Sequence, residues 1–256
     1  MAPPNALTIA GFDPSGGAGV LADCRTFESF GYRASAVVTS ITFQNNRQGL
    51  GAEHQNAASV RHQIESLLAE TQFVCAKTGM LPTGAVVREV ARLFRDHKLP
   101  APIVDPVMIA TSGLRLMEAE AFEVFIAEIL PLARLVTPNI SEAEVLARMT
   151  ITNEREMREA AKIIRGRGAR AVLVKGGHLN EQQSADDVPP EAIDFLDDDG
   201  SVATFRAQFI PGAKLHGSGC IMSAAIAAGV GKGNSLENSV RAAKGFVLQA
   251  LKMSEE

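Results

Sequence analysis

The sequence predicts an α/β fold with three layers: a central, mostly parallel sheet, helices on both of its faces, and an antiparallel hairpin at one edge. Two observations lead to this prediction. Apolar strand candidates alternate with amphipathic helix candidates along most of the chain, and strands that are apolar throughout are typical of a sheet buried on both faces. Near the C-terminus this alternation gives way to two short strand candidates around Asp199-Gly200, which is a hairpin signal.

The first elements follow one another as strand, loop and helix. Residues 6–10 (Ala-Leu-Thr-Ile-Ala) predict a buried strand, and the glycine-rich segment 11–19 leads from it into a helix that ends near Gly31. Residues 36–41 predict a second strand, followed by a helix that Asn56 caps.

The middle of the chain continues the same alternation. Residues 73–76 and 102–105 predict two strands, separated by a helix with one apolar face, and a further helix is expected around 121–129. Residues 135–136 predict a short strand. Ser141 and Glu144 have the spacing of a capping box, which predicts that the next helix begins there.

The last third predicts one more helix, one more buried strand and the hairpin. Asn153 and Glu156 repeat the capping signature, and residues 171–175 are apolar up to a terminal lysine. Residues 193–196 and 202–205 are the two strands of the expected hairpin. Residues 180–190 are polar and irregular and are expected to form a surface loop.

Composition narrows the class of protein. The 256 residues are 46% hydrophobic, which is enough for a sizeable core, and no linker or repeat divides them, so we expect one domain over residues 1–256. A net charge of -4 without a basic stripe argues against a nucleic-acid partner. No leader sequence and no apolar run near ~20 residues is present, so we expect a cytoplasmic protein without a membrane partner. The three cysteines lack metal or disulfide spacing and are expected to be reduced thiols.

The segment 215–220 (Leu-His-Gly-Ser-Gly-Cys) runs directly into an apolar helix candidate. The first turn of a helix has unpaired N–H groups and partial positive charge, and Gly217 and Gly219 allow close approach, so we expect an anion site there. Cys220 in this field is expected to have a lowered pKa and to be able to accept a proton. The alternative is a tight turn in which Cys220 is a small buried hydrophobic residue.

Polar residues follow several of the predicted strands, where ligands bind in open α/β sheets. Asp105, Asn139 and Glu142 offer the oxygen ligands that Mg²⁺ prefers, although Asn139 and Glu142 can equally serve to cap a helix. Lys175 and Gly177 end another strand as a phosphate-binding loop would, although a solvated lysine at a turn is an equally ordinary reading.

The glycine-rich segment 11–19 is neither a P-loop nor a dinucleotide-binding loop, because it has neither spacing. Asp23 lies one helical turn beyond it. Asp23 can hydrogen-bond an amino group of a ligand, but its position alone favours an exposed helix charge.

The ordered set of motifs resembles one family over about residues 6–250: the hydroxymethylpyrimidine/phosphomethylpyrimidine kinases of thiamine biosynthesis, which have the ribokinase-like fold. The motifs are Asp13-Pro-Ser-Gly-Gly-Ala-Gly19, Gln44-Asn45, Lys77-x-Gly79-Met80, Asp105-Pro-Val-Met108, Thr137-Pro-Asn139-x-x-Glu142, Lys175-Gly-Gly-His178 and His216-Gly-Ser-Gly-Cys220. The resemblance implies ATP- and Mg²⁺-dependent phosphorylation of 4-amino-5-hydroxymethyl-2-methylpyrimidine and then of its monophosphate. It also implies a homodimer.

The resemblance assigns roles to residues of this chain. Gly217, Gly219 and Cys220 would form the catalytic turn, with an anion hole for the transferring phosphoryl group and Cys220 as the candidate base. Asp105 and Glu142 would hold magnesium, on the same side as the nucleotide contacts Asn139, Lys175 and Gly177. The pyrimidine pocket would be formed by Gly11, Asp23, Gln44, Met80 and Val107.

The sequence departs from the family pattern at two places, and two rival functions remain open. Phe12 replaces a small hydroxylated residue of the family, and residues 210–215 replace a more polar run. The nearest rival is a pyridoxal kinase of the same branch, against which Gln44-Asn45 argues. A non-catalytic pyrimidine sensor is the other rival, but it would not need Asp105, Glu142, Lys175 and Cys220.

Overall fold

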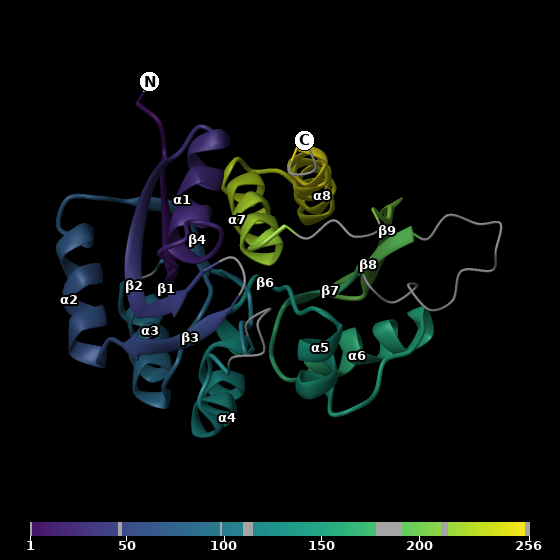
Figure 1. Cartoon of the computed structure of the whole chain (residues 1–256), viewed down its shortest axis with the longest axis horizontal. Helices are drawn as coiled ribbons and strands as arrows, with labels where there is room; N and C mark the ends of the chain where they lie inside the picture. Colours follow the sequence, from purple (N-terminus) through teal and green to yellow (C-terminus); the bar gives the residue numbers. More distant parts are fainter. Residues whose placement is uncertain are drawn as a thin grey trace.

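A computed structural model describes residues 2–45, 48–97, 99–109, 115–177, 191–210 and 215–253. The segment 180–190, expected to be a polar surface loop, lies outside these residues. The strands of the described part all belong to one sheet of nine strands (Figure 1).

The sheet has the order β3-β2-β1-β4-β5-β6-β7-β8-β9. Its central strands, from β2 to β7, are parallel, as the apolar strand candidates predict. Both edges are antiparallel, with β3 on β2 and the hairpin β8–β9 on β7. The strands are β1 (Asn5–Phe12), β2 (Arg33–Gln44), β3 (Gly49–His54), β4 (Phe73–Thr78), β5 (Ile103–Val104), β6 (Leu135–Val136), β7 (Ala171–Gly176), β8 (Glu191–Asp198) and β9 (Ser201–Gln208).

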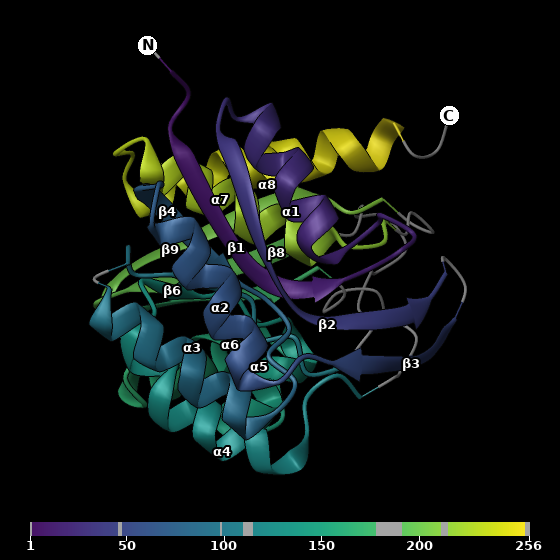
Figure 2. The same cartoon turned by 90° about the vertical axis from the view of Figure 1, so that its left-hand side faces the viewer.

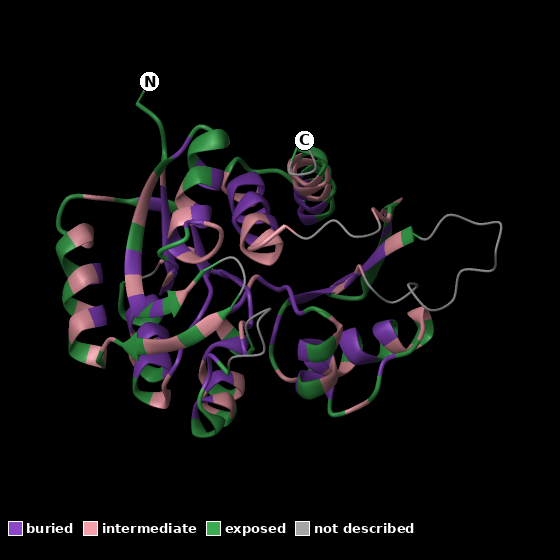
Figure 3. Cartoon of the chain, viewed as in Figure 1, coloured by how far each residue is buried: buried purple, intermediate pink, exposed green. Residues whose placement is uncertain are grey.

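Helices cover both faces of the sheet and confirm the three-layer prediction (Figure 1). One face carries α1 (Gly19–Ser29), α7 (Ser218–Gly231) and α8 (Leu236–Met253). The other carries α2 (Ala57–Leu68), α3 (Gly84–Asp96), α4 (Ala119–Glu128), the short 3₁₀ helix η1 (Leu130–Leu132), α5 (Ile140–Ala147) and α6 (Glu154–Gly166). Each layer buries its own apolar cluster against the sheet, with Phe27 and Ile226 in one and Val90 and Phe125 in the other. The buried stripes of the helices therefore face the strands (Figure 3).

The edge strand β3 is absent from the sequence prediction. Its residues include Gly49, Gly51 and the exposed Glu53 and His54, so the apolar alternation that signals a strand is missing. It pairs with the distal half of β2, and the two strands form a ribbon that projects from the sheet (Figure 2). Tertiary pairing produces this strand in the absence of local propensity.

The start of α5 differs from the prediction. Asn139 is the N-cap, its side chain accepts from the Glu142 amide, and the Glu142 carboxylate accepts from the Asn139 amide. The capping box is therefore Asn139 with Glu142, and the predicted pair Ser141 with Glu144 is wrong because the helix begins two residues earlier. Glu144 instead accepts from the amide of Ile151 beyond the helix.

The remaining signals are confirmed. Asn56 and Asn153 cap α2 and α6 through their side chains. Asp199 and Gly200 both have positive φ, 52° and 88°, as a tight hairpin turn requires. Among the described helices, none combines the length and the apolar character needed to cross a bilayer.

Candidate active site

A cavity opens where the carboxyl ends of β1, β2 and β4 approach the start of α7. Its walls come from segments far apart in the chain because parallel strands end at a common edge of the sheet. The lining residues are Ala10, Gly11, Phe12, Asp13, Ala18, Gly19, Thr42, Gln44, Lys77, Gly79, Met80, Val107, Leu116 and Cys220.

Four of the five residues predicted to contact the substrate line this cavity: Gly11, Gln44, Met80 and Val107. Gly11 lies against the Met80 side chain, since a Cβ atom on Gly11 would be 3.0 Å from the Met80 sulfur. Phe12, the departure from the family pattern, lines the cavity as well and adds an aromatic wall.

Asp23, the fifth predicted residue, lies behind the wall. Its side chain is fully buried, so the interpretation as an exposed helix charge is wrong. Its carboxylate accepts from Lys77 Nζ at 2.8 and 3.0 Å and from Thr8 Oγ1 at 2.6 Å. Lys77 thus stands between Asp23 and the cavity, and Asp23 does not line it.

The buried Lys77 is a site residue to which the sequence analysis assigned no role. Burial alone would lower its pKa, but the adjacent Asp23 carboxylate raises the pKa above its ordinary value. The ammonium is therefore charged at neutral pH and brings a fixed positive charge to a largely apolar cavity. The signal was available: a lysine in the otherwise apolar segment 73–78.

The turn before α7 leaves two amides of the described chain without a backbone acceptor. Gly217 is the N-cap, with φ of 79° and no side-chain cap. The Ser218 amide donates to Leu215 O and the Ile221 amide donates to Gly217 O. Within the described part of the chain, the amides of Gly219 and Cys220 have no such acceptor. They are suited to bind an anion, as the sequence predicts.

Cys220 is half-buried, and its thiol differs from the sequence prediction. Burial raises its pKa to about 11, and Asp23 and Asp105 add to the rise, while Lys77 and a hydrogen bond from the Gly19 amide oppose it. The expected lowering of the pKa is wrong because burial, together with the charges of Asp23 and Asp105, outweighs the groups that favour the thiolate. Cys220 is therefore a neutral thiol at neutral pH in the free protein.

A second charged cluster lies on the other side of the turn. Lys175 Nζ is 3.1 Å from Asp105 Oδ1, which also accepts from Thr137 Oγ1 at 3.3 Å. A Cβ atom on Gly219 would be 3.2 Å from Lys175 Nζ and 3.5 Å from Asp105 Oδ2. The predicted catalytic turn and the two predicted polar residues therefore adjoin.

Glu142 belongs to the same cluster. Burial raises its pKa to about 7, with Asp105 adding to the rise and Lys175 opposing it. For Lys175, burial alone would lower the pKa, but Asp105 and Glu142 raise it above the ordinary value. Glu142 therefore caps α5 and also places a carboxylate beside Asp105 and Lys175.

The residues predicted to contact a nucleotide lie together at the ends of β6 and β7. Asn139 pairs with Lys175 in an isolated parallel bridge, and Gly177 follows two residues later. A Cβ atom on Gly177 would meet none of the described atoms within 4 Å. The fourth residue of this motif, His178, lies outside the described residues.

The donor set of this cluster fits a magnesium ion. Asp105 and Glu142 supply two carboxylates close enough to influence each other's charge, and Mg²⁺ usually binds through one or two carboxylates and phosphate oxygens while keeping water ligands. No group of three His, Cys, Asp or Glu side chains suited to a metal occurs within the described ranges. Two carboxylates suit a cation whose other ligands are phosphate oxygens and water.

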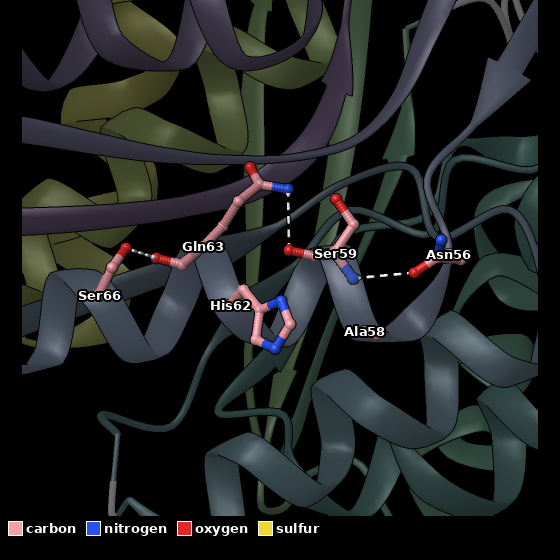
Figure 4. A pocket seen from close by; sticks show the side chains of 6 residues that line it. All are labelled: Asn56, Ala58, Ser59, His62, Gln63 and Ser66. Atoms are coloured by element: carbon pink, nitrogen blue, oxygen red, sulfur yellow. Dashed lines mark hydrogen bonds between the residues drawn. The ribbon is translucent and has the colours of Figure 1, made fainter.

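A second hollow lies on the outer surface of α2, lined by Asn56, Ala58, Ser59, His62, Gln63 and Ser66 (Figure 4). Two of its hydrogen bonds are local to the helix, since the Ser59 amide donates to Asn56 and Ser66 donates to Gln63 O. It brings together no carboxylate, lysine or cysteine, so it lacks the chemistry of the cavity beside Cys220.

Comparison with known sequences gives one family. A family model described as phosphomethylpyrimidine kinase matches residues 13–256. A relative named hydroxymethylpyrimidine/phosphomethylpyrimidine kinase, from Rhizobium meliloti (strain 1021), is 39% identical over 251 residues, which cover 98% of this chain and 91% of the relative.

Solved structures agree on the fold. The crystal structure of phosphomethylpyrimidine kinase from Clostridium difficile 630 superposes with a TM-score of 0.82 at 32% identity, covering 97% of this chain and 99% of that one. The pyridoxal kinase from Staphylococcus aureus, in complex with AMP-PCP and pyridoxal, gives a TM-score of 0.86 at 29% identity, covering 98% and 89%. Both are kinases with the three-layer arrangement expected from the motifs.

Proposed function

The chain belongs to the phosphomethylpyrimidine kinase family, and we propose that it transfers the γ-phosphoryl group of ATP to 4-amino-5-hydroxymethyl-2-methylpyrimidine and then to the monophosphate, in thiamine biosynthesis. One observation carries the proposal. The cavity that holds Gly11, Gln44 and Met80 is also lined by Cys220 of the anion-binding turn. An alcohol bound in the cavity would therefore lie next to the place where a phosphoryl group binds.

The cavity suits an aminopyrimidine. Met80, Val107 and Phe12 offer apolar surface to the faces of the ring, and the Gln44 amide can both donate to and accept from ring and amino nitrogens. Lys77 adds a cation that can donate to a ring nitrogen. In this proposal Asp23 acts through Lys77, because both Asp23 oxygens are already engaged.

Phosphoryl transfer requires positioning and charge neutralisation more than covalent chemistry. In the proposed reaction the bond from Pγ to the bridging oxygen of ATP breaks, a bond from Pγ to the alcohol oxygen forms, and the hydroxyl proton leaves. The amides of Gly219 and Cys220 would bind the equatorial oxygens, and Lys175 would add positive charge from the nucleotide side. Asn139 and Gly177 would border the nucleotide.

Asp105 and Glu142 are the residues that would hold Mg²⁺. The ion, when bound, would neutralise negative charge on the phosphates. Glu142 must be ionised for this role, and its raised pKa places that ionisation near neutral pH.

The hydroxyl proton needs an acceptor. Cys220 is adjacent to the cavity, but a pKa of about 11 leaves few thiolates at neutral pH. The anion hole therefore carries the main catalytic role of the turn, and Cys220 as base is a separate prediction that the pH profile tests.

Pyridoxal is the alternative substrate, because a pyridoxal kinase superposes as well as the phosphomethylpyrimidine kinase does. Purified protein should be assayed for ADP formation with the pyrimidine alcohol, its monophosphate or pyridoxal, each against a control without alcohol. We expect turnover with one or both pyrimidines. Turnover with pyridoxal alone would replace the proposal by the alternative, and pyrimidine binding without any turnover would indicate a sensor.

The proposed function comes with three expectations, on the domain, the location and the assembly of the protein. We propose that residues 1–256 form one kinase domain, that the protein acts in the cytoplasm, and that it forms a homodimer. Exposed Ile41, Phe43 and Leu50 on β2 and β3 are apolar side chains that a second subunit would cover, and light scattering coupled to size-exclusion chromatography measures the assembly.

A further inference from the structure

The carboxylate of Asp13 joins two parts of the site that are 203 residues apart in the sequence. Asp13 follows β1 and is only 1% exposed. Its oxygens accept from the Ser15 amide and hydroxyl, both at 2.9 Å, and from the Ala18 amide at 3.0 Å. The fourth partner is His216, whose Nε2 lies 2.8 Å from Asp13 Oδ2.

The ionisation of Asp13 determines which atom donates. Burial alone would raise its pKa, but the hydrogen bonds from Ser15, His216 and Ala18 outweigh burial and lower the pKa below its ordinary value. An ionised carboxylate only accepts hydrogen bonds, so His216 Nε2 carries the proton that it donates.

Two glycines allow the loop and the turn to approach this closely. A Cβ atom on Gly17 would lie 2.3 Å from His216 Cδ2, and one on Gly217 would lie 2.1 Å from the Gly17 carbonyl oxygen. Any side chain at either position would push the glycine-rich segment 13–19 away from the start of α7. The two segments therefore contact each other through backbone atoms and the His216 imidazole, and no space remains for an added side chain.

The far end of the same segment reaches the thiol. Asp13, Ala18 and Gly19 line the cavity together with Cys220. Segment 13–19 is thus one wall of the cavity, and the hydrogen bond from His216 to Asp13 joins it to the anion-binding turn.

We propose that His216 is a positioning residue: by donating to Asp13, it holds segment 13–19 against the first turn of α7, so that an alcohol in the cavity is aligned with the amides of Gly219 and Cys220. This inference rests on the proposed function. His216 acts through Asp13, and the contacts proposed between the pyrimidine ring and Gln44, Met80 and Val107 do not depend on it. Loss of alignment lowers the rate more than it weakens binding, because transfer requires a near-attack geometry.

Two substitutions distinguish hydrogen-bond donation by His216 from the packing of its side chain. His216→Gln keeps an N–H group at nearly the position of Nε2, whereas His216→Leu has similar bulk and no donor. His62→Gln, on the exposed surface of α2, controls for the loss of a histidine. We expect His216→Leu to lower kcat about 100-fold with KM for the alcohol changed less than about threefold, His216→Gln to stay within about fivefold of the wild type, and His62→Gln to have no effect.

Amide hydrogen exchange of the free protein gives a readout that does not need activity. Exchange should accelerate in peptides covering 13–19 and 215–221 in His216→Leu and not in His216→Gln, with the other peptides unchanged. Equal kcat losses in both variants, a loss of alcohol binding that matches the loss of kcat, or unchanged exchange in His216→Leu would each overturn the positioning role. A wild type that turns over none of the three substrates contradicts the proposed function instead, and hydrogen exchange alone then decides whether His216 holds the segment.

Discussion

The ammonium of Lys77 lies 2.8 Å from the carboxylate of Asp23, and neither side chain is exposed to solvent. Thr8 donates to the same carboxylate, so the pair is enclosed by hydrogen bonds as well as by the core. Lys77 reaches the cavity wall and Asp23 does not. Asp23 is therefore connected to the site through Lys77, which is 54 residues away in the sequence.

Breaking this pair should be costly. Lys77→Met leaves the Asp23 carboxylate buried without a counter-charge and is expected to lower the free energy of unfolding by about 3 kcal/mol or more. The double variant Lys77→Met/Asp23→Asn removes both charges and should regain at least half of that loss. Urea denaturation measures both. A double variant no more stable than Lys77→Met would contradict an energetic link between the two charges.

Cys220→Ala should lower kcat by about 100-fold or more if the thiol takes the hydroxyl proton, while calorimetry should show pyrimidine binding nearly unchanged. Because the pKa is raised to about 11, such a base would make kcat rise about tenfold per pH unit from pH 7 to 10. Full activity in Cys220→Ala would refute the role as base. A flat pH profile would assign Cys220 to the anion hole alone.

Glu142→Gln should change stability in a pH-dependent way. The folded-state pKa of Glu142 is raised from 4.5 to about 7, so its contribution to stability is fully present below pH 4.5 and is lost as the pH rises through about 7. The glutamine keeps an acceptor for the Asn139 amide. We therefore expect the variant to match the wild type near pH 4.5 and to exceed it at pH 8.5, by up to about 3 kcal/mol.

Urea denaturation at the two pH values measures this difference, with Glu159→Gln on the exposed surface of α6 as the control for losing one charge. The same Glu142→Gln variant should lose activity at every pH, because a carboxylate oxygen of the proposed magnesium site is gone. A stability difference that does not depend on pH would contradict the raised pKa.

Gly217→Ala should disrupt the anion-binding turn. Its φ is 79°, and the new Cβ atom would lie 2.1 Å from Gly17 O. Gly233 is a matched control, because its φ is 82° and a Cβ atom there would meet nothing within 4 Å. Both variants should lose about 1 kcal/mol through backbone strain, and Gly217→Ala should lose more because its Cβ atom meets backbone atoms of Gly17 and Ala18. Only Gly217→Ala should also lose most of its kcat, and equal activities would show that the contact with Gly17 is unimportant.

Gln44→Ala should weaken pyrimidine binding about tenfold, because the amide is the group best suited to pair with the ring and amino nitrogens. Gln48→Ala, an exposed glutamine just beyond β2, is the control and should bind as the wild type does. Titration calorimetry with the pyrimidine alcohol measures both. Equal affinities in the two variants would remove Gln44 from the proposed pocket.

The central elements could be predicted from the sequence because their signals are local. The buried strand at residues 171–175, the cap at Asn56 and the turn at Asp199-Gly200 each follow from a few neighbouring residues. The strand β3 could not be predicted, because its residues carry no alternation and it exists through pairing with β2. The start of α5 was misplaced because Asn139 and Ser141 both have capping chemistry and only the fold selects one of them.

Within the site, the sequence predicted which residue types are present but not how they are arranged. It predicted a glycine turn at the start of α7 from two glycines before an apolar helix, and this turn depends on local backbone geometry alone. It predicted the pKa of Cys220 in the wrong direction, because that pKa depends on enclosure and on Asp23 and Asp105, which are distant in the chain. The pairing of Lys77 with Asp23 was missed for the same reason.

By itself, then, the sequence determined the alternation of strands and helices, the turn at 216–220 and the set of motifs that marks the family, because periodicity, glycine placement and residue order are properties of the chain. The tertiary structure alone decided that Asp23 faces Lys77, that His216 donates to Asp13, and that Lys175 and Asp105 adjoin Gly219. Those contacts arise where strand ends from distant segments converge, and the energies of burial and charge that govern them have no local signature.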